Sequence, residues 1–331
     1  YGTWKFKYRF PEAMRTCGGE GISFTYISTS GEDWGSFSFS QCCDSHHHCV
    51  ISHSEADFSI DYDDGVVLRD KWYTVTIIRT REGWIYVFRD DKIEFLVYEP
   101  KIEKSESISL RLVSPSSPKR YFDCLEVYAD KYLFPNKGII YGEYVSAYYS
   151  MNYKNYPIKK HGIIVKGRGI TLSKIAEEIN DPSLFTYDPD TRTAICYTNL
   201  VLDEGAELTI ENEVLKFHCD YDGELEFVLK YASELFVRNS IITSTNEHYW
   251  VWNLASTTTH YGYEIKLEEG REPDYYDFVM VLACSYHGRF IVENSIINNT
   301  AHLFFDSPYE LRIVNTKILN LHEIDIGNYT F

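Results

Sequence analysis

Four stretches in the second half of the chain repeat one pattern, in which apolar residues alternate up to an asparagine and resume after it. The asparagines are Asn212, Asn239, Asn294 and Asn315, at steps of 27, 55 and 21 residues. A weaker copy at 263–267, with Leu267 in the asparagine position, divides the long step. Each copy predicts two short strands joined at the asparagine, which tolerates the left-handed backbone of a sharp bend. The period predicts a solenoid of stacked rungs, with asparagine amides hydrogen-bonded up the stack.

One amphipathic helix is predicted before the first full copy. Its apolar residues follow the helical spacing i, i+3, i+4 and i+7: Leu172, Ile175, Ala176 and Ile179. The sequence 180–182, Asn-Asp-Pro, ends it. A helix at this place is expected to cap the solenoid and to cover the strand edges of the first rung.

The first 130 residues alternate with a period of two instead. One face of the opening strand carries Trp4, Phe6, Tyr8 and Phe10, and the other carries Lys5, Lys7 and Arg9. Similar short strands are expected at 22–26, 58–62, 72–78, 84–88, 93–97, 108–112 and 122–128. Many short strands separated by turns predict an antiparallel sandwich.

Two resemblances refine these expectations. The phrases at 1–6, 71–75, 83–90 and 122–128 resemble the concanavalin A-like, laminin G-like jelly roll of lectins and family 16 glucanases, over about 1–134. The repeats resemble the right-handed parallel β-helix of pectate lyases and of archaeal and phage surface proteins, over about 163–331. We therefore expect an all-β chain: an antiparallel jelly-roll sandwich at 1–134, a packed Tyr-rich connection at 135–162, and a short right-handed parallel β-helix with an N-terminal capping helix at 163–331.

Composition narrows the setting. The formal net charge of −17 argues against nucleic acid, which rewards basic surfaces. No apolar run of 18 or more residues occurs, so no membrane span is expected in this chain. Eight cysteines, an even number, and the sequons at Asn298 and Asn328 favour an extracellular glycoprotein with disulfides. The chain opens on Tyr1 without a signal-like start, so we expect a cleaved signal or an artificial boundary before it.

The densest group of metal-ligand residue types runs from Cys42 to Cys49. Thiolates and the imidazoles of His46 and His48 suit zinc or copper. The alternative, which we favour, is a solvated His loop braced by disulfides among Cys17, Cys42, Cys43 and Cys49. Adjacent histidines point in different directions on an extended chain, so at most two of the three could share an ion.

Two further groups leave alternatives open. Asp61, Asp63 and Asp64 could donate oxygens to a structural calcium ion, or could simply form a polar hairpin turn. No other cofactor is expected. Cys196 and Cys219 lie 23 residues apart, close to one rung, and could stack as a disulfide or as free thiols.

Catalytic motifs of the two resembled families are incomplete. The glucanase pattern Glu-x-Asp-x-Glu has only a partial counterpart at 55–59, without the second Glu. His287-Gly288 lacks the preceding Gly of the polygalacturonase motif, although His218, Asp220, Asp222 and Glu224 gather acid and base groups on one predicted loop. We name no catalytic residue, and an enzyme is the less favoured reading.

Binding by aromatic side chains is the stronger expectation. If Tyr249 and Val251 point inward, Trp250 and Trp252 share the outer face and form a platform with Tyr261 and Tyr263 for a glycan or a protein partner. The alternative is that the 255–275 loop folds over them.

The C-terminal end is expected to be an assembly surface. Leu319, Leu321, Ile324 and Ile326 keep a strand-like apolar pattern, and no capping helix is predicted after them. The expected occupants are another subunit, giving a head-to-tail chain, or a longer native chain; the alternative is a tail folded back over the last rung.

These patterns favour an extracellular structural or adhesive surface protein, a subunit of a cell-envelope sheath, S-layer or filament that self-associates or binds other surface proteins or glycans. The alternatives are a β-helix polysaccharide lyase or glycoside hydrolase with a carbohydrate-binding jelly roll, and a viral fibre or spike protein.

Overall fold

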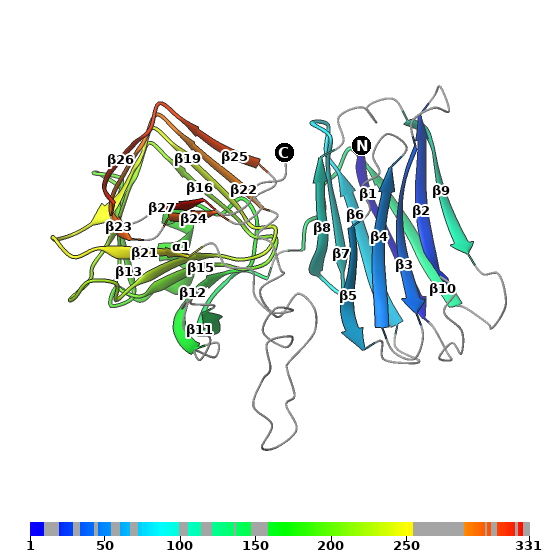
Figure 1. Ribbon diagram of the computed structural model, residues 1–331, viewed down its shortest axis with the longest axis horizontal. Coiled ribbons are helices and arrows are strands. Elements are labelled where there is room, and N and C mark those ends of the chain that lie inside the picture. Colours follow the sequence, from blue (N-terminus) through cyan, green and yellow to red (C-terminus); the bar gives the residue numbers. More distant parts are fainter. Residues whose placement is uncertain are drawn as a thin grey trace, which may run out of the picture. The chain divides into compact units, whose positions relative to one another are not determined.

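The computed structural model describes residues 1–9, 20–28, 34–42, 46–53, 60–66, 72–98, 105–113, 121–135, 137–146, 158–253, 288–301, 303–305, 310–321 and 324–326. Side chains within 20–66 and 105–113, and at a few other strand positions, are not described. The chain forms two compact units: the first contains Tyr1–Leu133, and the second begins at Phe134. Nearly all of the described elements are strands, which confirms the all-β prediction (Figure 1).

The described residues of the first unit form two five-stranded antiparallel sheets. One has the order β10 (Tyr121–Ala129), β1 (Gly2–Arg9), β6 (Trp72–Arg79), β7 (Trp84–Arg89) and β8 (Lys92–Tyr98). The other has the order β5 (Ile60–Val66), β4 (His46–His53), β3 (Trp34–Cys42), β2 (Glu20–Ser28) and β9 (Ser105–Val113). In β1 the side chains of Phe6 and Tyr8 are buried and that of Lys7 is exposed, as the alternation predicts.

The histidine run lies in a strand, so the predicted His loop is wrong at 46–49. Strand β4 pairs with β3 and β5, and His48 lies in register with Asp63 of β5. Asp61, Asp63 and Asp64 likewise belong to β5 and do not form a hairpin turn. Asp is depleted in strands, and pairing with the neighbouring strand overrides this preference in β5.

The second unit stacks short parallel strands into rungs (Figure 1). The first full rung comprises β15 (Asn199–Leu202), β16 (Glu207–Glu211) and β17 (Val214–Phe217). The next comprises β18 (Glu226–Leu229), β19 (Glu234–Arg238) and β20 (Ile241–Ser244). Then follow β21 (Trp250–Asn253), β22 (Arg289–Glu293) and β23 (Ile296–Ala301), and after them β24 (Leu303–Phe305), β25 (Glu310–Val314) and β26 (Lys317–Leu321). The last described strand is β27 (Ile324–Ile326), which pairs with β24.

The 55-residue step between Asn239 and Asn294 spans one rung of the solenoid, not two. Strand β19 pairs directly and in parallel with β22, with Leu235 opposite Phe290. The prediction that 263–267 supplies an intervening strand between them is therefore wrong, and residues 254–287 are inserted between β21 and β22 of one rung.

The asparagine positions have the predicted backbone. Asn212, Asn239, Asn294 and Asn315 have φ angles of 54°, 49°, 50° and 48°. This left-handed region is uncommon for residues with a Cβ and is visited most readily by Asn and Asp. The predicted amide ladder is present at its last step, where Asn315 Nδ2 donates to Asn294 Oδ1 at 3.2 Å.

The front end of the stack is covered. Strand β11 (Ile139–Ser146) pairs antiparallel with β12 (Ile158–Val165), which pairs with β15. The described strands at the two ends of the predicted connection 135–162 therefore pair with the solenoid. Helix α1 (Leu172–Ile179) confirms the capping helix: Leu172 and Ile175 are buried, Thr171 caps its start, and Asn180, at φ 48°, ends it. Strands β13 (Phe185–Asp188) and β14 (Thr193–Cys196) form a hairpin that pairs with β17.

Candidate functional site

The last full rung differs from the rungs before it in the exposure of its inward-facing residues. Strands β16, β19, β22 and β25 stack in register, so their corresponding residues form columns. The first inward column is Leu208, Leu235, Phe290 and Leu311, and the second is Ile210, Val237, Val292 and Ile313. The three inner members of each column are 0% exposed, whereas Leu311 and Ile313 are each 37% exposed. The solenoid core is therefore open at β25.

The backbone of β25 is also open on one side. In the described part of the chain, β25 is the edge strand of its four-stranded sheet. Glu310 N donates to Gly288 O, and Val314 O accepts from Asn294 N, so these two residues direct backbone groups towards β22. Because alternate residues of a strand face opposite neighbours, Leu311 and Ile313 direct their N–H and C=O groups to the open edge. Such an edge is a template for pairing with another strand.

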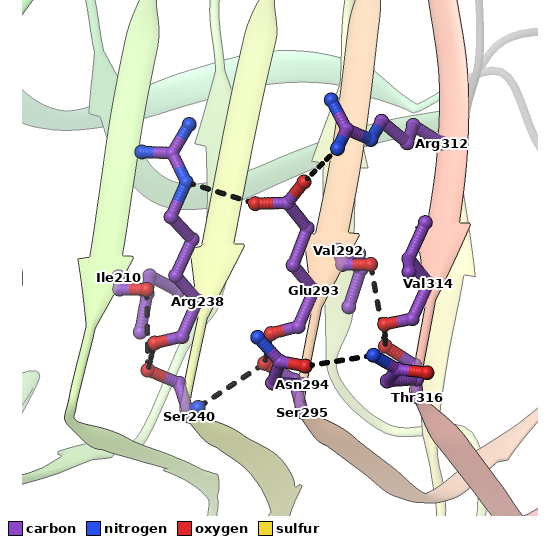
Figure 2. A network of polar contacts seen from close by, with 11 residues as sticks. Ile210, Arg238, Ser240, Val292, Glu293, Asn294, Ser295, Arg312, Val314 and Thr316 are labelled. Carbon is purple, nitrogen blue, oxygen red and sulfur yellow. Dashed lines mark hydrogen bonds and ion pairs between the residues drawn. The ribbon is translucent and has the colours of Figure 1, made fainter.

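Polar contacts hold the last rung in the same register as the inner ones (Figure 2). Ser240 N donates to Ser295 Oγ at 3.1 Å, and Ser240 Oγ donates to the carbonyl of Ile210 at 3.2 Å. Thr316 Oγ1 repeats this contact two rungs later, donating to the carbonyl of Val292 at 3.2 Å. The last rung is thus built like the others, and its exposure follows from its position in the stack.

Ion pairs run along the outer face of the same sheet. Glu293 accepts from two guanidinium groups: Arg238 Nε is 3.3 Å from Oε2, and Arg312 Nη2 is 2.9 Å from Oε1 (Figure 2). Of the three side chains, Arg312 is the most exposed, at 55%. One carboxylate between two guanidinium groups leaves positive charge on the last rung at Arg312.

A second charged column lies at the start of these strands. Arg168 bridges Glu207 and Glu234, with Nη1 2.9 Å from Glu234 Oε1. Arg289 then bridges Glu234 and Glu310, with Nη1 3.2 Å from Glu234 Oε2 and Nε 2.9 Å from Glu310 Oε2. The column ends on Glu310, so β25 presents an acidic and a basic side chain two residues apart on its outer face.

The two central tryptophans of the predicted aromatic platform point the other way. Trp250 and Trp252 are 0% and 1% exposed. Trp250 stacks on Phe217 with ring centroids 4.8 Å apart, and Trp252 meets Phe290 edge-on at 5.1 Å. Both are core residues, so the prediction that they share an outer face is wrong; Tyr261 and Tyr263 lie outside the described residues.

The predicted acid-base loop forms separate local pairs. His218 Nδ1 lies 2.7 Å from Thr245 Oγ1, while His248 Nδ1 lies 3.1 Å from Asp222 Oδ1. Asp220 is 83% exposed at its side chain and approaches His218 Nε2 only to 3.9 Å. Among the described residues, no group of three or more His, Cys, Asp or Glu side chains is placed to hold a metal ion.

Three cysteines whose side chains the structure describes are free thiols. Cys196 and Cys219 are buried and free, which selects the free-thiol alternative for this pair, and Cys124 is exposed and free. Burial raises the pKa of the Cys196 thiol to about 12 and that of Cys219 to about 11. The side chains of Cys42, Cys49, His46, His48, Asp61 and Asp63 are not described, and Cys17 and Cys43 lie outside the described residues.

The structure describes only one of the two predicted glycosylation sites, the sequon at Asn298. Asn298 Nδ2 lies 3.4 Å from Thr243 Oγ1, and its Oδ1 accepts from Asn320 Nδ2 at 3.1 Å, so its amide takes part in the stack. The Thr300 hydroxyl of this sequon is buried and donates to the carbonyl of Trp250. Asn328 lies outside the described residues.

One buried polar group has no counterpart in the sequence predictions. Glu226 is 1% exposed, pairs with Lys160, and accepts from the Tyr144 hydroxyl at 3.4 Å. Burial and the neighbouring carboxylate raise the pKa of Tyr144 above its ordinary range. Lys160 and Glu226 are 66 residues apart, and only the strand register brings them together.

Comparison with protein-family models finds no match, and comparisons with curated proteins and with solved structures find none either. In the described residues no helix is long and apolar enough to cross a bilayer. The candidate site is therefore the last rung, chosen for the exposed apolar side chains and the unpaired strand edge of β25.

Proposed function

We propose that this protein is a structural subunit of an extracellular surface assembly, in which copies join through the open last rung of the solenoid. The observation that carries the proposal is the 37% exposure of Leu311 and Ile313, where each corresponding inner residue is fully buried. Fully burying an aliphatic side chain of this size contributes about 1.5–3 kcal/mol. A contact that covers this end therefore gains apolar burial and pairs a free strand edge at once.

We also propose a fold family for each of the two units. We assign the first unit to the concanavalin A-like jelly rolls, supported by its two five-stranded antiparallel sheets. We assign the second to the right-handed parallel β-helices, supported by its parallel rungs of three short strands and its capping helix. Both are common scaffolds, and function rests on the site rather than on the fold.

Contact between proteins fits the described surface better than binding of a glycan. The expected glycan platform depended on exposed indole rings at Trp250 and Trp252, and both are in the core. The last rung instead combines apolar side chains, free backbone groups and charges of both signs, which is the composition of a sheet-forming contact.

The test is the mass in solution over a concentration series, measured by analytical ultracentrifugation. We expect the wild type to associate, and Leu311→Asp and Ile313→Asp to remain monomeric. Leu125→Asp is the matched control, because Leu125 is a 55% exposed apolar residue on β10 of the first unit. A wild type that is monomeric throughout, or a Leu311→Asp variant that associates as strongly, would overturn the proposal.

A further inference from the structure

The occupant of the open edge can be specified from its charges and its free backbone groups. This step rests on the proposed function and names the partner surface. We propose that two copies pair β25 with β25 in antiparallel fashion, with Leu311 opposite Leu311 of the second copy and Glu310 opposite its Arg312. The contact is two-fold, tail to tail, and closes at two chains.

The direction of the contact follows from the covered front end. A head-to-tail contact would set β25 against the first rung, where Leu208 and Ile210 are 0% exposed beneath the cap. Helix α1 and the bridge between Ile170 and Leu208 occupy that end. The last rung can meet another last rung without displacing any of these elements.

The free backbone groups restrict the register. Leu311 and Ile313 direct N–H and C=O to the edge, so a two-fold axis can pass through a hydrogen-bonded pair of Leu311 or Ile313 residues, or between them at Arg312. An axis at Arg312 sets this guanidinium against its own copy, which is unfavourable. An axis at Ile313 sets Arg312 against the apolar Val314.

Only the axis at Leu311 makes the charges complementary. It places each Glu310 opposite an Arg312 of the second copy, on the outer face, and so creates two reciprocal ion pairs. These extend both charged columns across the axis, because Glu310 already accepts from Arg289 and Arg312 already donates to Glu293. The inward side chains of Leu311 then meet above a core that continues from one solenoid into the other.

The experiment uses charge reversal and mixing. Glu310→Arg alone and Arg312→Glu alone should each weaken dimerisation about 30-fold or more, because both cross-strand pairs become like-charged. An equimolar mixture of the two variants should form a 1:1 heterodimer, since each reversed residue then faces its opposite charge. The double variant, with both reversals in one chain, should again form a homodimer of near wild-type affinity.

A second measurement does not depend on the variants. Hydrogen exchange of the wild type should slow at the amide of Leu311 as concentration rises through the dimerisation constant. Melting temperatures of the single variants establish that they are folded before mixing is interpreted.

The outcomes separate the two proposals. A wild type that stays monomeric overturns both the assembly role and this geometry. A wild type that associates while the mixed variants do not pair, or whose Leu311 amide exchanges at an unchanged rate, overturns the register and leaves the assembly role standing. Wild-type species larger than two chains overturn the closed two-fold contact.

Discussion

Arg289 Nη1 lies 3.2 Å from Glu234 Oε2, although the two residues are 55 positions apart in the sequence. They occupy equivalent places in adjacent strands, since Glu234 is the register partner of Arg289. The same two rungs repeat this spacing at Ser240 and Ser295. The stack therefore continues without a missing rung across the inserted residues, and a carboxylate that is 0% exposed is neutralised from both sides along the stack.

Replacing that carboxylate should strongly destabilise the solenoid. Glu234→Gln leaves Arg168 and Arg289 facing a neutral amide in a buried place, and removal of one partner from a buried ion pair costs about 3–5 kcal/mol. Arg238→Gln is the control, because Arg238 is 40% exposed in its pair with Glu293 and a partly exposed pair contributes about 1 kcal/mol or less. Calorimetric melting of both variants measures the difference; equal losses would contradict the buried network.

The asparagine bends should tolerate glycine and reject β-branched residues. Asn239 has φ 49°. Valine in this region is strained by roughly 1–3 kcal/mol, whereas glycine adopts it without steric cost. We expect Asn239→Gly to melt close to the wild type and Asn239→Val well below it. If both variants lost the same stability, the backbone angle would not be the reason for asparagine at this position.

Trp250 should behave as a core residue. Its ring is fully buried between neighbouring aromatic rings, so Trp250→Ala should cost about 3–5 kcal/mol of unfolding free energy. Trp72 is 39% exposed, and Trp72→Ala should cost about 1 kcal/mol or less. Urea unfolding curves measure both. A larger loss for Trp72 would restore the interpretation that Trp250 lies on the surface.

The sequence was sufficient for features that depend on local pattern. The left-handed asparagines, the 27-residue spacing and the capping face of Leu172 and Ile175 are all found where the alternation and the helical spacing placed them. The bend and the helix face are set by residues close together in the chain, and the spacing is a direct count along the sequence.

The incorrect predictions concern features that depend on which strands pair and in which register. In the short strand β21, Trp250, Val251 and Trp252 are all apolar, so periodicity could not choose whether Val251 or Trp252 faces the core. The large rings face it because the centre of a rung leaves space for them beside Phe227. The weak copy at 263–267 matched the repeat by spacing alone, and only strand pairing shows that β19 meets β22. An uncovered C-terminal end of the stack was predicted from the sequence. The exposure of Leu311 and Ile313 on β25 was not.

Alkaline solution should test the two buried thiols. A thiol whose pKa is raised on folding keeps its proton in the folded chain while the unfolded chain, with a pKa near about 8.5, loses it. The stabilisation is fully present below that value and is lost as pH rises towards about 11 for Cys219 and about 12 for Cys196. Each thiol adds a slope of roughly 1.4 kcal/mol per pH unit between these limits.

The matched variant for this slope carries Cys196→Ala and Cys219→Ala together. Its unfolding free energy, measured by urea at steps from pH 8 to pH 11, should fall less steeply than that of the wild type. The starting stability differs because core volume is lost, so only the slopes are compared. Parallel curves would contradict the buried, protonated state of the two thiols.

Opening the front of the stack should change the size of the assembly. Leu172 and Ile175 of α1 are both 0% exposed against the first rung. Replacing both by Glu places two carboxylates in an apolar contact, which detaches the helix because buried unpaired charge is costly. The apolar core above the first rung then loses its cover, while β12, β14 and the Ile170 bridge still pair the strands of that rung. Chains with an uncovered apolar surface at each end can join without closing, so we expect species larger than dimers in ultracentrifugation, where the wild type stops at two. Glu177→Gln, on the exposed side of the same helix, is the control and should leave the dimer unchanged. A Leu172→Glu, Ile175→Glu variant that keeps its fold by circular dichroism and forms only dimers would show that α1 does not limit the assembly.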